Sequence, residues 1–522
     1  MIKPIQIFLF LVSVFLGLLL FALLLPSDGL RINEEYKISF VKLEKIFSLN
    51  DTSKVVYKDI KGIIEAAKEE AKDSVAPDVL SFIPKHTEEE TSENSLLLVN
   101  DSIKEVIKLN IDALKKKVSP IQYPNNDLHP LRKFLKKIAL GQEKIRILHY
   151  GDSQIELDRI SSYLRHRLRE RFGGSGVGLL PAFPLFDNTI SMKHKNIGDW
   201  KRYSAYTKPS REIEHDRYGA LASFARVSYN QNDSLEAVNS IFLSPNSSKM
   251  GFNIIQIFYA NNDTNAIVEA YWQGELIRRE KLKKMTNLST VYWELETKIE
   301  DIELRFTNTS GYTDVFAISL ETNNGIVVDN ISLRGSSGTF FTKLDKQHYM
   351  SMISQISPDF VILQFGGNVM PYIKEEKQCV NYAKSFKKQI QFLQKMLPEA
   401  SFMLIGPSDM STKIDGEFVT FPFLPSVNKQ LKKVAFECNI AYWDMFKAMG
   451  GENSMPSWVE SDPPLATKDY VHLTGKGAEA ISNLLYNALD LELNKYLIEE
   501  NEISENHFTK KEEKEEEEIY EE

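Results

Sequence analysis

Cysteine is scarce in this chain. Only Cys379 and Cys438 occur among its 522 residues, so at most one disulfide can form. The two residues could pair in an oxidising compartment or remain buried thiols, and the sequence leaves both possibilities open. No residue spacing typical of a zinc site occurs either, and we expect neither a metal nor another cofactor.

An excess of basic residues is also missing. The formal net charge is −9, but residues 499–522 hold twelve acidic residues and three lysines, which leaves 60 basic and 60 acidic residues in the rest of the chain. A balanced charge argues against nucleic acid as a partner. We interpret residues 499–522 as a solvated, disordered acidic tail.

Charged residues are absent from residues 5–25, a stretch rich in Leu, Phe, Val and Ile. Its 21 residues are enough to span a bilayer as a helix. Lys3 precedes it, so the positive-inside rule keeps the N-terminus in the cytoplasm and exports the chain that follows. We predict a transmembrane anchor within residues 1–29 and a location in the cell membrane, with the rest of the chain on the extracytoplasmic, periplasmic side. A cleaved signal peptide is the alternative, although no Ala-x-Ala-like site follows the apolar run.

No serine lies in a Gly-x-Ser-x-Gly sequence, which excludes the nucleophile elbow of α/β-hydrolases. Another serine stands out, because Gly151-Asp152-Ser153 follows an apolar run typical of a buried strand. Open α/β sheets hold reacting groups just beyond the carboxyl ends of their strands, where we expect Ser153. A serine needs a base, and His472 lies far downstream with Asp469 three residues before it. That spacing lets the carboxylate orient the imidazole.

Two further strand-like runs end in residues suited to stabilising an oxyanion. Residues 329–334 lead into Gly335, where no side chain would cover the backbone N–H. Residues 360–365 lead through two glycines to Asn368, whose side-chain amide could donate a hydrogen bond. Each run could also be an ordinary strand-to-helix connection.

Two of these predicted site residues have rivals nearby in the sequence. Gly338 competes with Gly335, but Gly335 lies closer to the end of its strand. Asp409, which follows another predicted strand, competes with Asp469. Asp469 has the better spacing to His472, so we favour it.

In this order, the four segments resemble the conserved blocks of the GDSL, or SGNH, hydrolase family. The resemblance covers residues 140–185 and 325–492 and departs from the family at Val369, where an aspartate often stands. It implies a three-layer, flavodoxin-like α/β fold with a parallel sheet. It also implies the roles of the site residues: Ser153, Asp469 and His472 for catalysis, and Gly335 and Asn368, with the Ser153 backbone, for the oxyanion hole.

The long gap between the first two blocks has a different character. It contains runs rich in β-branched and aromatic residues, separated by Asn, Asp and Gly turns, a pattern typical of an all-β sandwich. Such an insertion is similar to the carbohydrate-binding-like module of peptidoglycan O-acetylesterases in the family. We predict strands at 252–260, 266–272, 290–296 and 302–307. Some of its aromatic residues could stack on sugars, although we expect most to be core residues: Trp200, Tyr203, Tyr206, Tyr271, Trp272 and Trp293.

After the insertion, the pattern returns to alternating strands and helices, which indicates a parallel sheet covered on both faces. We predict strands at 360–366, 401–406 and 440–446, and helices at 373–397, 426–437 and 474–490. The domain organisation is then an anchor (1–29), a stalk with a helical lead-in (30–130), the hydrolase in two parts (131–189 and 326–498), the inserted β-sandwich (190–325) and the acidic tail (499–522).

The resemblance and the insertion together imply a serine esterase that removes or transfers O-acyl groups, O-acetyl above all, on an acylated extracytoplasmic glycan. Similar membrane-anchored members of the family work with a membrane-bound O-acyltransferase, so an O-acetyltransferase with such a partner is the first alternative. A non-catalytic glycan-binding envelope protein with a decayed hydrolase fold is the second. The presence of all five proposed site residues argues against decay.

Overall fold

The computed structural model divides into two compact units, Met1–Val56 and Tyr57–Glu522. In the first unit, helix α1 covers Pro4–Leu24, and strands β1 (Leu30–Arg31) and β2 (Lys37–Ile38) pair antiparallel. None of the described helices is both long enough and apolar enough to cross a membrane. The structure describes residues 4–24, 30–31, 37–38, 57–68, 101–141, 144–207, 210–229, 237–262, 265–308 and 310–521.

The second unit contains a parallel sheet of five strands: β3 (Ile145–Gly151), β15 (Ile326–Ser332), β16 (Phe360–Gln364), β17 (Ser401–Ile405) and β20 (Ala441–Trp443). The strands lie in the order β15-β3-β16-β17-β20. Numbered along the chain, this is the flavodoxin-like order 2-1-3-4-5, as the resemblance implies. The order reverses between β3 and β16, which is where open α/β sheets bind their ligands.

Helices cover both faces of this sheet. Side chains alternate between the faces along each strand, and in β16 Phe360 and Ile362 join one hydrophobic cluster while Val361 and Leu363 join another. The three-layer α/β architecture predicted from the sequence is therefore confirmed. The first cluster includes α5 (Arg132–Leu140), α6 (Ser161–Phe172) and α12 (Gly475–Glu521), and the second includes α7 (Lys346–Ile356), α8 (Glu376–Met396) and α9 (Leu424–Glu437).

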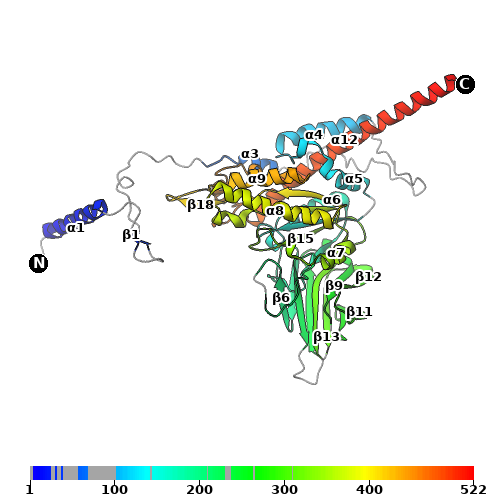
Figure 1. Ribbon diagram of the computed structural model, residues 1–522, viewed down its shortest axis with the longest axis horizontal. Helices are drawn as coiled ribbons and strands as arrows, with labels where there is room; N and C mark the ends of the chain where they lie inside the picture. The colour runs from blue at the N-terminus through cyan, green and yellow to red at the C-terminus, as the bar shows by residue number, and fades with distance from the viewer. Residues whose placement is uncertain are drawn as a thin grey trace. The chain divides into compact units, whose positions relative to one another are not determined.

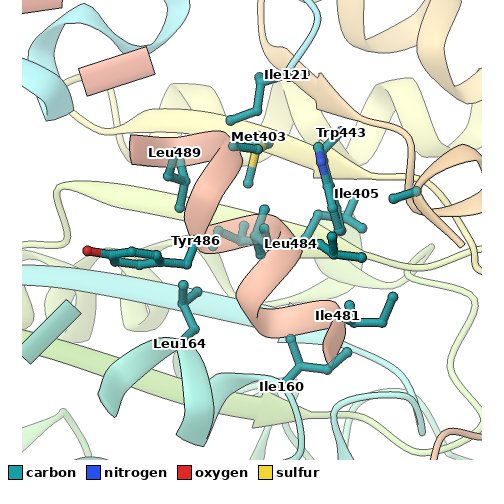
Figure 2. Packing of buried hydrophobic residues seen from close by; sticks show 14 of the residues in the cluster. Ile121, Ile160, Leu164, Met403, Ile405, Trp443, Ile481, Leu484, Tyr486 and Leu489 are labelled. Carbon is teal, nitrogen blue, oxygen red and sulfur yellow. The ribbon is translucent and has the colours of Figure 1, made fainter. Parts of the chain in front are cut away.

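The start of helix α12 is held firmly in the first cluster. Ile481 and Leu484 of this helix are buried together with Ile405 of β17, Trp443 of β20 and Leu164 of α6 (Figure 2). Full burial of one such aliphatic side chain contributes roughly 1.5–3 kcal/mol. Because α12 begins directly after the loop that carries the predicted base, this packing also fixes the position of that loop.

The two cysteines do not pair. Cys379 lies in α8 and Cys438 directly follows α9, and both are buried free thiols. The strands predicted after the insertion are confirmed as β16, β17 and β20, and the predicted helices as α8, α9 and the start of α12.

The inserted β-sandwich is confirmed as two antiparallel sheets whose facing side chains form a third hydrophobic cluster. Figure 1 shows its strands in green, below the helices α8 and α9. Strand β4 (Gly176–Leu180), which follows α6, pairs with β14 and so joins the sandwich to the α/β part. One sheet contains β5 (Met192–Ile197), β8 (Ala237–Pro245), β10 (Ile267–Trp272), β11 (Glu275–Lys281) and β13 (Ile302–Asn308), and the other β6 (Trp200–Ser204), β7 (Ser223–Tyr229), β9 (Phe252–Ala260), β12 (Ser289–Ile299) and β14 (Gly311–Glu321).

Part of the predicted stalk packs into the second unit, which begins at Tyr57. It includes α3 (Lys61–Lys68) and α4 (Asp101–Lys117). Ile107 of α4 is buried, and Asn110 donates a hydrogen bond to Asn494 of α12 at 3.4 Å. The physical reason is the apolar stripe of α4, which needs a partner surface and finds it on α12 (Figure 1).

The C-terminal segment also differs from the prediction. Helix α12 continues to Glu521, through the residues that the sequence predicts to be a disordered tail. Glu and Lys have high helix propensity. Extending a helix that is already packed needs no new nucleus, whereas starting one in an isolated segment does.

Candidate active site

A cavity of about 340 Å³ lies at the carboxyl ends of the parallel strands. Its lining comes from the loops that follow β3, β15, β16 and β17 and from the loop before α12. The lining includes four of the five predicted site residues: Ser153, Gly335, Asn368 and His472. No group of His, Cys, Asp or Glu side chains suited to holding a metal ion is found among the described residues.

Ser153 and His472 are in hydrogen-bond contact, although 319 positions separate them in the sequence. Ser153 Oγ lies 2.8 Å from His472 Nε2, and Nδ1 of the same ring lies 2.7 Å from Asp469 Oδ2. An ionised carboxylate can only accept a hydrogen bond, so Nδ1 must carry a proton. In a neutral imidazole, Nε2 is then free to accept the proton of the Ser153 hydroxyl.

Asp469 is held as a carboxylate by several donors. Its Oδ1 accepts hydrogen bonds from Thr467 Oγ1 at 2.6 Å and from the backbone N–H groups of Val471 and His472 at 2.9 and 3.0 Å. Burial by itself raises the pKa of Asp469, but these hydrogen bonds and the one from the His472 ring outweigh it and hold the pKa well below its usual range. Asp469 is therefore ionised at neutral pH, as a residue that orients an imidazole must be.

The rival carboxylate, Asp409, has another role. It is fully buried and accepts hydrogen bonds from Thr420 Oγ1 at 2.7 Å, Ser454 Oγ at 3.2 Å and the Met455 N–H at 2.7 Å. Among the described residues, no hydrogen bond joins it to His472. Asp409 thus connects three segments of the fold, and Asp469 is the carboxylate that contacts the imidazole.

Of the two candidate glycines, Gly335 lines the cavity. Its φ of 78° lies in the left-handed region that favours glycine. Within the described part of the chain, neither the Gly335 N–H nor the Ser153 N–H has an acceptor. The rival Gly338 already donates its N–H to Ser336 Oγ at 3.1 Å, and a Cβ there would lie 2.7 Å from the Phe365 ring. Two unengaged N–H groups at the cavity wall are what an oxyanion needs.

The side-chain amide of Asn368 is fully engaged. Its Nδ2 donates to Asp152 Oδ2 and to the Ser336 carbonyl, both at 3.1 Å. Asp152 is buried, and its Oδ1 accepts the Gln154 N–H at 3.0 Å. These contacts anchor Asn368 in the cavity wall, and the residue must release one N–H before it can donate to an oxyanion.

Replacing Asp152 with asparagine is expected to change how stability depends on pH. Burial raises the pKa of Asp152 from 3.8 to about 6, although the Gln154 N–H partly offsets the effect. The folded state therefore binds the proton more tightly than the unfolded state does. As a result, the stability of the wild type falls as the pH rises between these two pKa values. The loss is about 2 kcal/mol in the free energy of unfolding when the pH rises from about 4 to 7, and Asp152→Asn lacks it.

Denaturant unfolding of both proteins at the two pH values measures this difference. Asp301→Asn, at an exposed aspartate, serves as the control and is expected to follow the wild-type profile. Equal pH dependence in the wild type and in Asp152→Asn would contradict the expected titration.

Arg159 joins the loops that carry Ser153 and His472, and sequence reasoning misses it. Its Nη2 donates to the Ser153 carbonyl at 2.7 Å and its Nη1 to the Leu473 carbonyl at 2.8 Å. Gln154 adds a second link, from its Nε2 to the carbonyl of the residue before His472, at 2.7 Å. No sequence signal marks such residues, because their partners are backbone carbonyls that any residue can supply.

The aromatic residues of the β-sandwich are mostly core residues, as expected. Trp200, Tyr203 and Trp293 are at most 8% exposed and belong to hydrophobic clusters. Tyr206, Tyr271 and Trp272 are half-buried. The sandwich therefore presents no fully exposed ring from this set for sugar stacking.

Comparison with solved structures identifies the fold. A peptidoglycan O-acetylesterase matches over 70% of this chain and 96% of its own, with 20% sequence identity and a TM-score of 0.55. The chain therefore shares the fold of this protein, in agreement with the fold that the family resemblance in the sequence implies. Two other structures match too loosely to add to this assignment. An acetyl xylan esterase has 18% sequence identity, covers 31% of this chain and 81% of its own, and has a TM-score of 0.25. A family two carbohydrate esterase from Cellvibrio japonicus has 9% sequence identity, covers 58% of this chain and 100% of its own, and has a TM-score of 0.22. No protein-family model and no curated protein sequence matches the chain.

Proposed function

We propose that the protein is a serine esterase that removes O-acyl groups, O-acetyl in particular, from an extracytoplasmic glycan. One observation carries the proposal: Ser153, His472 and Asp469 form a hydrogen-bonded series beside a cavity with two unengaged N–H groups. Such a series supplies a nucleophile, its base and the carboxylate that orients the base. The fold shared with a peptidoglycan O-acetylesterase supports an acylated glycan as the substrate.

The proposed reaction has two halves. Ser153 Oγ bonds to the ester carbonyl carbon while His472 Nε2 takes the hydroxyl proton, and the N–H groups of Ser153 and Gly335 stabilise the oxyanion. Collapse of this intermediate breaks the bond to the sugar oxygen, which takes the proton from His472 and leaves as an alcohol. Water then attacks the acyl-serine with His472 as base, which releases the carboxylic acid and restores Ser153.

Asn368 is the third oxyanion donor in this proposal. Its Nδ2 would turn from the neutral Ser336 carbonyl to the charged oxyanion, because hydrogen bonds to ionised acceptors are roughly twice as strong. Its contact with Asp152 would keep the amide in place during that change.

The size of the cavity supports a small acyl group. Its volume of about 340 Å³ is at the lower end of ligand cavities, which measure roughly 300–1,000 Å³. An acetyl group and part of a sugar ring fill such a space, whereas a long acyl chain needs a larger apolar channel.

Acetate release from isolated cell-envelope glycan tests the proposal. The full-length protein is expected to release acetate in water, and Ser153→Ala is expected to release none. A second reaction contains a non-acetylated oligosaccharide, and acetyl transfer to it without acetate release would indicate a transferase. Binding of the glycan without either product would contradict an enzymatic function.

Attachment to the membrane is a further part of the proposal, and it depends on the 21 uncharged residues at 5–25. Deleting residues 1–29 is expected to move the protein from the membrane fraction to the soluble extract, because the apolar segment is lost. Immunoblotting of the two fractions measures the change. A full-length protein found in the soluble extract, or a mature N-terminus that begins after residue 25, would contradict an uncleaved anchor.

A further inference from the structure

The lining of the cavity includes two residues that the proposed chemistry does not use, Arg334 and Tyr372. Arg334 directly precedes Gly335, in the loop after β15. Tyr372 lies in the same short segment as Asn368, in the loop after β16. Both therefore come from loops that carry proposed oxyanion donors.

Arg334 keeps most of its hydrogen-bonding capacity. Its side chain is 58% exposed, and its Nη1 lies 3.3 and 3.4 Å from the two carboxylate oxygens of Glu156. Among the described residues, no acceptor meets its Nη2 or its Nε. The guanidinium thus contacts Glu156 and lies over the Phe186 ring, 5.7 Å from its centre, while its Nη2 and Nε keep donors that no described residue uses. Such a planar fork is suited to binding a carboxylate through two parallel hydrogen bonds.

The positive charge of Arg334 is not cancelled locally. Glu156 also interacts electrostatically with Arg159, whose Nε donates to the Glu156 backbone carbonyl at 3.0 Å, so one carboxylate lies near two cations. Asp152 is the carboxylate in the cavity lining, and both of its oxygens accept protein donors. Asp469 is bound to Nδ1 of the imidazole and is not part of the lining.

Tyr372 has the most exposed large apolar side chain among the described residues, at 77%. An aromatic ring left uncovered at the mouth of a ligand cavity offers an apolar face to the C–H groups of a sugar. In the β-sandwich, Trp200, Tyr203 and Trp293 are buried, and Tyr292, which is 52% exposed, does not line this cavity.

We propose that Arg334 and Tyr372 form the sugar-recognition site of this cavity, and that the acylated glycan carries a carboxylate. Arg334 binds the carboxylate of the acylated sugar unit or of its neighbour, and Tyr372 stacks on the ring. This inference rests on the proposed esterase function and adds the substrate class: an O-acylated acidic glycan, as opposed to a neutral one.

A pair of substrates that differ only in charge tests the role of Arg334. One is an O-acetylated oligogalacturonide, and the other is the same oligosaccharide with its carboxyl groups converted to primary amides. The wild type is expected to favour the acid in kcat/KM by about ten- to a hundredfold, the usual effect of a hydrogen-bonded charge. Arg334→Gln is expected to bring this ratio close to one. Arg334→Lys keeps the charge but loses the planar pair of N–H donors, so it is expected to give an intermediate ratio.

Arg279→Gln is the matched control. The Arg279 side chain is 59% exposed and lies 3.4 Å from Glu269, so it resembles Arg334 in exposure and pairing, but it belongs to β11 and not to the cavity. This variant is expected to keep the wild-type ratio. Tyr372→Ala is expected to raise KM severalfold for both oligosaccharides without changing their ratio, and Tyr372→Phe to restore the wild-type KM, since the ring face is retained.

The outcomes separate this inference from the proposed function. Turnover of 4-nitrophenyl acetate by the wild type supports the esterase, whatever happens with the oligosaccharides. If that ester is cleaved while the acid and the amide react equally, or Arg334→Gln keeps the wild-type ratio, the inference is wrong and the esterase stands. If no ester is cleaved, the esterase function fails. Calorimetric titration of Ser153→Ala with the same pair then decides whether the cavity still prefers the acid, and equal affinities overturn the inference.

Discussion

Replacing Ser153 with alanine is expected to abolish ester hydrolysis, with a loss in kcat on the order of 10⁴-fold or more. The variant lacks the oxygen that bonds to the acyl carbon, so no acyl-enzyme can form. Only the binding of the ester and its contact with the Gly335 N–H then remain. The initial rate of 4-nitrophenyl acetate hydrolysis measures the loss, and mass spectrometry after fluorophosphonate treatment should find the adduct on Ser153 of the wild type.

Ser337→Ala is the control for this experiment. Ser337 is half-buried in the loop after β15 and does not line the cavity, so its hydroxyl should not affect turnover. Ser153→Ala that retains a tenth of the wild-type rate, or that is still labelled by the fluorophosphonate, would exclude Ser153 as the nucleophile.

Replacing Asp469 with asparagine should have the second-largest effect, a decrease in kcat on the order of 10³- to 10⁴-fold. The carboxylate requires the proton to be on Nδ1 of His472, which leaves Nε2 as the acceptor that faces Ser153. An asparagine amide can donate to Nδ1, which stabilises the other tautomer with its proton on Nε2. That tautomer cannot take the hydroxyl proton. An asparagine oxygen can still accept the hydrogen bonds that Oδ1 receives, so we expect the fold to be retained.

The comparison with Asp409→Asn tells the two carboxylates apart. Asp409 is fully buried and connects three segments of the fold, so its replacement is expected to lower Tm while kcat of the folded protein falls less than about tenfold. Rates corrected for the folded fraction, together with thermal unfolding curves, measure both effects. A larger loss in kcat for Asp409→Asn than for Asp469→Asn would reverse the assignment.

Local patterns were enough to predict the elements that carry the site. The apolar run that ends at Ser153 lies in β3, and the run before Asn368 lies in β16, because a strand buried on both faces needs a continuous apolar sequence. The predicted strand at 252–260 is β9, with the same bounds. The helix expected at 474–490 is the start of α12.

The sequence was less informative about features that depend on contacts between residues far apart in the chain. It could not show that α4 packs on α12, or that a polar tail continues a packed helix. Nor could it identify Arg159, whose partners are carbonyls of two loops that are distant in the sequence. The exposure of Tyr372 is equally invisible in the sequence, since the same residue type is buried at Tyr203.

By itself, the sequence determined the class of fold, the insertion of a β-sandwich and the small set of residues from which a site could be built. These features depend on periodicity and on turn residues, which act over a few neighbouring positions. The sequence favoured Gly335 over Gly338 and Asp469 over Asp409, but only the tertiary structure shows the contacts on which these choices depend. Each choice depends on which atoms meet in the cavity once strands far apart in the chain lie side by side, and local sequence gives only the spacing from which such contacts can be expected.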